Sequence, residues 1–341
     1  MKFFSQSLSE AERADILKGM KRVIAHENFI SGPEVKELEA KLTSYFGRET
    51  VTCNSGTDAL VLGLRALGIG PGDEVITSAF TYFATVEAIA EVGAKPVMAD
   101  IDLATFNIDP ASIASRITRR TKAVLVVHLF GLACDMAPIA RLCRARGLKL
   151  VEDCAQSFGA RDGGKLTGTF GDVGCFSFFP TKNLGGFGDG GAVVIRSKAV
   201  AKTFRLLKNH GQPRKYEHAV MGVNSRLDTL QAVVLLRKLE RLGKDLKLRQ
   251  DRAASWLKKF EGRKDVLALP SQPGHTYNVF TLLVRDRAAF LREMEREGVP
   301  TAIYYEKPAY RQQAYVGMFG RHARLKNAEF AAKHAISLPA H

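Results

Sequence analysis

The sequence has no long hydrophobic run and little cysteine. Nowhere in its 341 residues do 18 apolar residues follow one another, and the start, MKFFSQSLSEAERADIL, has no apolar stretch behind basic residues. We therefore expect no membrane-spanning helix, no secretory signal and a cytoplasmic protein that does not bind membranes. The five cysteines are scattered, odd in number and never spaced as CxxC. This usage argues against a disulfide framework and against a zinc site, and we expect no metal.

Acidic residues are in the minority, with 35 Asp and Glu against 50 Lys and Arg and a formal net charge of +15. A positive excess favours anionic partners, such as nucleic acid, an anionic membrane or small phosphorylated substrates. The basic residues form only mild clusters, at 116–122, 141–149 and 208–215, and no long basic arm. Charge alone therefore does not choose the partner.

Short β-rich runs alternate with helical patterns through the first two thirds of the chain. Strands are expected at 49–53, 73–77, 95–101, 122–130, 148–154, 174–179 and 191–195, and helices at 56–67, 82–92 and 136–146. This alternation predicts an α/β fold with a largely parallel sheet covered by helices. Apolar residues at three- and four-residue steps over 226–256 predict a long amphipathic helix that leads into a second domain. We expect a large domain at 1–235 and a small one at 236–341.

Ligands in open α/β sheets bind outside the carboxyl ends of the strands, so polar residues directly after apolar runs are candidates for a site. Ser55, Gly56 and Thr57 fall between a strand and a helix, where small residues, free backbone amides and a positive helix end can hold a phosphate. A plain helix N-cap is the alternative. No glycine is followed by the Lys-Ser/Thr pair of a nucleotide P-loop, which excludes that motif.

Two charged residues follow other strands. Asp153 closes the run LKLVED, where a partly buried carboxylate needs a positive partner, although a helix N-cap is again the alternative. Lys182 follows another apolar run and precedes a stretch with five glycines in eight residues, which predicts close approach of the backbone to something bulky. An amine that can form a Schiff base, an acid that can hold a protonated pyridine nitrogen and a phosphate cradle are the parts that a pyridoxal phosphate enzyme needs.

Six motifs along the chain carry a family resemblance: NSGTDAL, GPGDEVITSAFTYFAT, GAKPVMADID, VEDCAQSFGA, SFFPTKNLGGFGDGG and GVNSRLDTLQA. They resemble, in order and over about residues 25–340, the motifs of the nucleotide-sugar aminotransferases of fold type I, the aspartate aminotransferase-like superfamily. The resemblance implies a mainly parallel seven-stranded sheet in the large domain and a smaller C-terminal α+β domain. It also implies pyridoxal 5'-phosphate as the cofactor, with pyridoxamine phosphate as an intermediate form.

The resemblance also implies roles for single residues. Lys182 matches the lysine that binds the cofactor covalently, and Asp153 matches the aspartate on the pyridine nitrogen. The other matches to cofactor-binding positions are Tyr82, stacked on the ring; Gln156, near the ring hydroxyl; and Gly56, Thr57 and Ser177, at the phosphate.

Two further matches concern the neighbouring subunit and the substrate. Asn224 matches an asparagine that reaches the phosphate of the neighbouring subunit, so the resemblance implies a homodimer with shared active sites. Arg226 resembles a position near the substrate, with an interface ion pair as the alternative. The segment 303–315 departs from the family pattern but lies near the sugar in relatives, and Tyr304 and Tyr310 are interpreted as substrate-binding residues.

The segment KNLGGFGDGG resembles the branch that aminates a C3 ketone. We therefore expect transfer of an amino group from an amino acid, L-glutamate in view of the family, to a UDP-linked 2-acetamido-3-keto uronic acid, as in lipopolysaccharide O-antigen or other polysaccharide biosynthesis. A dTDP-linked 3-keto-6-deoxyhexose is the competing acceptor. A sugar dehydratase of the same fold would carry histidine in place of Lys182. A non-catalytic nucleic-acid-binding regulator would suit the charge, but no helix resembles a recognition helix, so no nucleic acid partner is expected.

Overall fold

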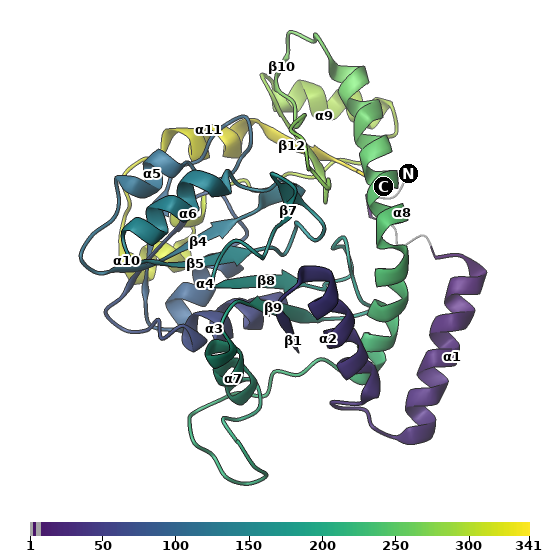
Figure 1. Cartoon of the computed structure of the whole chain (residues 1–341). Coiled ribbons are helices and arrows are strands. Elements are labelled where there is room, and N and C mark those ends of the chain that lie inside the picture. Colours follow the sequence, from purple (N-terminus) through teal and green to yellow (C-terminus); the bar gives the residue numbers. More distant parts are fainter. Residues whose placement is uncertain (1–2, 5–7) are drawn as a thin grey trace.

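The central feature of the protein is a seven-stranded sheet, seen in a computed structural model that describes residues 3–4 and 8–341 (Figure 1). Its strands, in spatial order, are β1 (Glu49–Cys53), β9 (Gly191–Ile195), β8 (Val173–Ser177), β5 (Lys149–Asp153), β4 (Thr121–Val127), β2 (Glu74–Ser78) and β3 (Lys95–Ala99). Only β9 runs antiparallel to its neighbours β1 and β8. The predicted α/β class and the mainly parallel seven-stranded sheet are confirmed.

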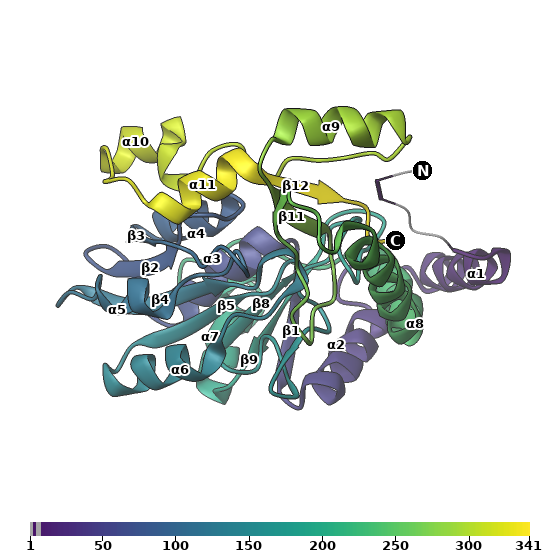
Figure 2. The same cartoon turned by 90° about the horizontal axis from the view of Figure 1, so that it is seen from above.

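Helices cover both faces of this sheet (Figures 1 and 2). They are α2 (Pro33–Phe46), α3 (Gly56–Ala66), α4 (Ala84–Glu91), α5 (Pro110–Ala114), α6 (Met136–Ala145) and α7 (Lys198–Leu207). A short 3-10 helix η1 (Leu129–Gly131) follows β4, and a small hairpin of β6 (Arg161–Asp162) and β7 (Lys165–Leu166) follows β5. The predicted helix at 82–92 begins two residues later, because Tyr82 and Phe83 form the turn that leads into it.

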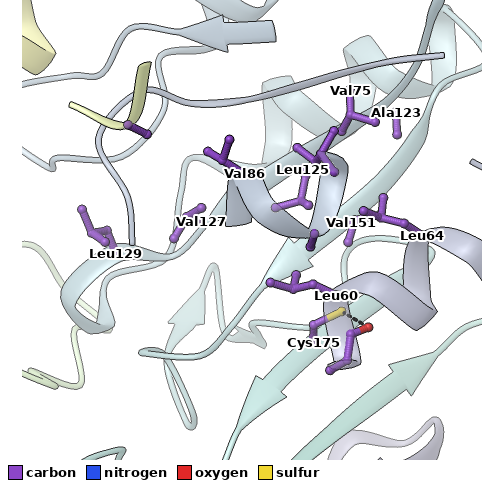
Figure 3. Packing of buried hydrophobic residues seen from close by; sticks show 14 of the residues in the cluster. Leu60, Leu64, Val75, Val86, Ala123, Leu125, Val127, Leu129, Val151 and Cys175 are labelled. Atoms are coloured by element: carbon purple, nitrogen blue, oxygen red, sulfur yellow. Dashed lines mark hydrogen bonds between the residues drawn. The ribbon is translucent and has the colours of Figure 1, made fainter. Parts of the chain in front are cut away.

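Side chains of each strand alternate between two cores, as the two-residue period of a strand requires. Val75 and Leu125 pack under α3 and α4, in the cluster that Figure 3 shows. Their neighbours Ile76 and Val124 point to the other face and pack with α5 and α6. Because both faces are buried, the strands have nearly continuous apolar sequences.

The long helix α8 (Thr229–Phe260) joins this sheet to a second, antiparallel sheet. The second sheet has the order β10 (Val266–Ala268), β11 (Phe280–Val284) and β12 (Ala335–Leu338), and its region also holds α9 (Arg287–Arg296), η2 (Ala309–Arg311), α10 (Gln313–Phe319) and α11 (Lys326–His334). Leu242 of α8 still packs with the large sheet, whereas Trp256 packs with the small one. The division at residue 235 stays a prediction.

The remaining helix, α1 (Glu10–His26), packs along α8 and begins with a capping box between Ser9 and Glu12. Among the described residues, no helix combines the length and the apolar character that a bilayer crossing requires.

Candidate active site

A cavity of about 590 Å³ opens at the carboxyl edge of the large sheet. The parallel strands β1, β2, β4, β5 and β8 all end at this edge, so residues that follow them along the chain meet in space. The cavity is lined by nine of the residues singled out from the sequence: Ser55, Gly56, Thr57, Tyr82, Asp153, Gln156, Ser177, Lys182 and Tyr304.

Asp153 is the last residue of β5 and is 6% exposed. Burial raises the pKa of its carboxyl group, and three groups oppose this shift: the backbone N–H of Ala155, the Thr85 hydroxyl and the Lys182 ammonium. Its Oδ1 accepts the Ala155 N–H at 3.1 Å, and its Oδ2 accepts the Thr85 hydroxyl at 2.9 Å. These bonds stabilise the ionised form inside the protein.

Lys182 lies in the loop after β8, and its backbone N–H donates to the carbonyl of Phe179 at 2.9 Å. Burial lowers the pKa of its ammonium, and the charge of Asp153 partly opposes this shift. A lysine in such a setting carries a larger neutral fraction near neutral pH than a surface lysine does. The neutral amine is the nucleophilic form.

The first turn of α3 forms the cradle that the sequence predicts. Ser55 is the N-cap, and its hydroxyl accepts the backbone N–H of Asp58 at 3.0 Å. A Cβ atom at Gly56 would lie 2.6 Å from Cβ of Ser177, so only glycine lets the helix start come this close to the end of β8. The helix N-terminus and the Ser177 hydroxyl then face the same space, which suits a phosphate.

The glycine-rich segment after Lys182 approaches the protein itself. A Cβ atom at Gly191 would lie 2.3 Å from the carbonyl oxygen of Ser55, and one at Gly186 would lie 2.8 Å from Oε1 of Gln231. The predicted close approach is therefore found, but its partners in the described chain are the cradle backbone and α8. The glycines thus hold the Lys182 loop against the cradle.

The Gln156 side chain connects two walls of the cavity. Its Oε1 accepts the backbone N–H of Phe130 at 2.8 Å, which fixes the amide orientation, and its Nε2 donates to the Tyr305 hydroxyl at 3.1 Å. Burial raises the pKa of Tyr305, so this phenol stays protonated. Tyr82 lies beside it, with ring centroids 6.4 Å apart, and is 63% exposed. An exposed aromatic face at a cavity wall suits stacking on a planar ligand.

Three predicted residues lie outside this cavity. Asn224 lines a separate cavity of about 610 Å³ between α3, α4 and α10, which shares Thr57 with the first. Arg226 lines neither, and its buried Nε has no hydrogen-bond partner. Tyr310 is fully buried; its hydroxyl donates to Glu329 and accepts the Leu325 N–H, both at 3.0 Å. The interpretation of Tyr310 as a substrate-binding residue is therefore wrong, because its hydroxyl holds α11 in place.

The structure also brings in residues that sequence reasoning missed. Thr85 and Asp189 belong to two of the six motifs, and Tyr305 belongs to the segment 303–315, whereas Phe130 and Asn278 had no local signal. Thr85 follows Tyr82 by three residues in FTYFAT and lies in the first turn of α4, where its side chain is buried behind the cavity. Asn278 comes from the C-terminal part of the chain, and only the fold places it beside Lys182.

A buried cluster of His128, Glu152 and Cys154 lies next to Asp153, with its potential ligand atoms within 4.8 Å of one another. Nδ1 of His128 accepts the backbone N–H of Cys134 at 3.0 Å, so Nε2 carries the proton and faces Glu152 at 2.9 Å. The two Glu152 oxygens also accept backbone N–H groups, from Gly168 at 2.7 Å and from Gly171 at 2.6 Å. These atoms are used within the protein, which suits a structural role.

Comparison with known proteins agrees with this geometry. The model of the DegT/DnrJ/EryC1/StrS aminotransferase family matches residues 10–341. The chain belongs to this family. Family membership and the cavity together make it an aminotransferase of fold type I.

Three relatives match nearly the whole chain. It is 43% identical to the UDP-N-acetyl-3-dehydro-alpha-D-glucosamine 3-aminotransferase of Acidithiobacillus ferrooxidans, over 96% of this chain and 89% of the relative. It is 42% identical to the UDP-2-acetamido-2-deoxy-3-oxo-D-glucuronate aminotransferase of Pseudomonas aeruginosa, over 95% and 90%. It is also 40% identical to a protein of Geobacillus stearothermophilus named pleiotropic regulatory protein, over 97% and 90%.

Among solved structures, the fold matches NtdA of Bacillus subtilis with bound PMP, the pyridoxamine phosphate cofactor. The TM-score is 0.91 and the identity 32%, over 97% of this chain and 78% of that one. The family is one that uses pyridoxal phosphate. The residues of this cavity fit that group, because they offer a buried amine, a buried carboxylate, an exposed aromatic face and a cradle that a single Cβ atom at Gly56 would fill.

Proposed function

We propose that the protein transfers an amino group from an amino acid, L-glutamate, to C3 of a keto sugar linked to UDP, with pyridoxal phosphate as its cofactor. The observation that carries the proposal is the meeting of Lys182, Asp153 and the cradle at Gly56 in one cavity. No single one of these features is specific. Their combination supplies each group that such a cofactor requires.

The residues of the chain have distinct tasks in this proposal. Asp153 would hold the pyridine nitrogen, Tyr82 would stack on the ring, and the N-terminus of α3 with Ser177 would hold the phosphate. When bound, pyridoxal phosphate supplies an electron sink for the bonds of the carbon that carries the amino group. Burial lowers the pKa of Lys182, so its neutral amine can accept a proton beside the cofactor and return it.

We propose that the second subunit of a homodimer completes the site. Asn224 does not reach the cavity of its own chain but lies on the neighbouring cavity at Thr57. The loop between α7 and α8, which carries Asn224, stands out from the body in Figure 1. Its exposed Tyr216 and Met221 are 81% and 86% accessible. Apolar side chains on a protruding loop suit burial against a partner, and a two-fold axis would bring both loops to both sites.

The proposed acceptor is a UDP-linked 2-acetamido-3-keto uronic acid. Among the described residues that line the cavity, Lys182 is the one cation, so a sugar carboxylate needs a further cation from outside. Arg226, next but one to Asn224 and with an unpaired buried Nε, is the candidate for this task in the dimer. Arginine binds carboxylates through two parallel hydrogen bonds.

The test is a comparison of acceptors with L-glutamate as donor. We expect the purified protein to aminate UDP-2-acetamido-3-keto-glucuronate with a higher kcat/KM than the corresponding UDP-3-keto-glucosamine or a dTDP-3-keto-6-deoxyhexose. Arg226→Gln should lower kcat/KM for the uronate by roughly 10-fold or more and change the uncharged sugars little. A preference for an uncharged sugar would reject the uronate, and absence of transfer to all three would reject the proposed activity.

The relative named as a pleiotropic regulatory protein is the observation that favours a second candidate, a regulator without catalytic activity. A regulator needs neither the amine of Lys182 nor the carboxylate of Asp153. Full biological function of a Lys182→Ala variant in the organism would support the regulator and contradict the enzyme.

A further inference from the structure

We propose that Thr85 and Thr81 form a two-hydroxyl relay that holds Asp153 as the ion partner of the pyridine nitrogen, and that they are therefore positioning residues of the reaction. This inference rests on the proposed function, because it assigns a task to residues behind the cofactor site. Neither threonine was among the residues that the sequence singled out.

The contacts of the relay are short and buried. Thr85 Oγ1 lies 2.9 Å from Oδ2 of Asp153, and Thr81 Oγ1 lies 2.9 Å from Oγ1 of Thr85. The two threonines are 1% and 4% exposed. Thr81 lines the cavity, whereas Thr85 lies behind it.

The direction of the hydrogen bonds follows from the number of protons. A threonine hydroxyl has one proton, and an ionised carboxylate has none to give. Thr85 therefore donates its hydrogen bond to Asp153, and Thr81 donates its hydrogen bond to Thr85. With an ionised Asp153 the two bonds run in the same direction, and each hydroxyl polarises the next.

The relay matters because Asp153 is buried and few groups around it can stabilise its negative charge. The titratable groups around Asp153 come from four parts of the chain. Glu152 and Cys154 are its neighbours in sequence, and Cys175 and Lys182 lie in β8 and the loop after it. His128 follows β4, and Tyr305 lies in the segment after α9. Of these, Lys182 has a pKa that burial lowers, and Nδ1 of His128 accepts a backbone N–H, which is the hydrogen-bond pattern of a neutral imidazole. Fixed donors must therefore stabilise the charge, and Thr85 is the one side-chain hydroxyl that bonds Asp153 in the described chain.

The backbone explains how Thr85 reaches the carboxylate and how Thr81 reaches Thr85. Thr81 lies in the turn after β2, and Thr85 lies in the first turn of α4, four residues later. Tyr82 between them projects into the cavity. The segment TYFAT thus places the ring that stacks on the cofactor and the hydroxyls that serve its nitrogen partner on one rigid turn.

The experiment compares Thr85→Val, Thr81→Val and Thr85→Ser with a matched control, Thr77→Val. Thr77 is also fully buried, and its hydroxyl donates to the carbonyl of Leu125 at 2.8 Å, away from Asp153. The readouts are the dissociation constant of pyridoxal phosphate and the ¹⁵N chemical shift of the ring nitrogen in labelled cofactor, which reports whether that nitrogen is protonated.

We expect Thr85→Val to weaken cofactor binding roughly 10-fold, because a hydrogen bond to a charged group is lost. Its ¹⁵N shift should move toward the value of an unprotonated ring. Thr81→Val should show a smaller change in the same direction, and Thr85→Ser should restore both readouts. Thr77→Val should leave the ¹⁵N shift unchanged.

Two failures can be told apart. If the wild-type protein binds no pyridoxal phosphate, the proposed function is wrong, and so is the task assigned to the two threonines. If the wild type binds the cofactor but Thr85→Val keeps the wild-type ¹⁵N shift, the relay alone is wrong. The serine variant, which keeps the hydroxyl, separates this outcome from a packing defect at position 85.

Discussion

The amide of Gln156 donates to the hydroxyl of Tyr305 at 3.1 Å, across 149 residues of sequence. Gln156 follows the central strand β5, and Tyr305 belongs to the C-terminal part of the chain, so this bond joins the two parts at the cavity. Because Gln156 supplies the hydrogen, the Tyr305 proton is free to point to a ligand.

Tyr305→Phe tests this arrangement. We expect the variant to fold normally and to lose roughly 10-fold in kcat/KM for the keto sugar, because one donor to the ligand is removed. The control is Tyr277→Phe, which also removes a buried hydroxyl, here bonded to the carbonyl of Pro270 at 2.9 Å away from the cavity. Equal kinetics for Tyr305→Phe and the wild type would show that the hydroxyl does not serve the reaction.

The ionisation of Lys182 should depend on Asp153. In the cofactor-free protein, the rate at which Lys182 reacts with a small aldehyde should reach half its maximum below pH 10.5, because burial lowers its pKa and the neutral amine is the reactive form. Asp153→Asn should move this midpoint further down, because the negative charge that raises the pKa of Lys182 is lost. The measurement is reductive trapping at several pH values with mass spectrometry.

Asp189→Asn is the control for that experiment. Asp189 also lines the cavity, but it is not among the groups that shift the pKa of Lys182. We expect it to leave the midpoint in place. A rise of the midpoint in Asp153→Asn would contradict the assigned pairing.

Gly56→Ala should destabilise the protein and the phosphate cradle together. The new Cβ atom would meet Cβ of Ser177 at 2.6 Å, and such overpacking costs about 1–3 kcal/mol in free energy of unfolding. The double variant Gly56→Ala/Ser177→Gly should recover part of this loss, because the opposing Cβ atom is gone. Urea unfolding of the cofactor-free protein measures the difference.

A second glycine provides the opposite expectation. A Cβ atom at Gly243, within helix α8, would meet no other atom within 4 Å. Gly243→Ala should raise the free energy of unfolding by roughly 0.5–1 kcal/mol, because alanine loses less conformational freedom in a helix. If both glycine variants are destabilised alike, the contact with Ser177 is not the cause.

The shared site can be tested with mixed dimers. Lys182→Ala and Asn224→Ala should each be nearly inactive, but subunits of the two variants, unfolded and refolded together, should regain about a quarter of the wild-type activity, because half of the dimers are mixed and each mixed dimer has one intact site. A mixture of Lys182→Ala with Asp153→Ala should regain nothing, since both residues line the same cavity within one chain. Equal recovery in both mixtures, or in neither, would contradict the position proposed for Asn224.

Local patterns in the sequence determined the sheet, the helices and the ends of strands at which Gly56, Asp153 and Lys182 stand. The reason is physical: alternation of apolar residues sets which segments are buried, and parallel strands bring their following residues to one edge. The same patterns did not reveal the direction of β9, which pairs antiparallel with β1 and β8, because an apolar run of five residues is the same in either direction.

Only the tertiary structure decided which of the remaining polar residues share the cavity. Tyr304 and Tyr310 are close in sequence, yet Tyr304 lines the cavity and Tyr310 is buried against α11. Thr85 and Tyr305 became site residues because α4 and the C-terminal segment pack onto the edge of the sheet, a contact between segments far apart in the chain. Local propensity fixes the conformation of a segment, whereas the neighbours of its side chains depend on how the whole chain packs.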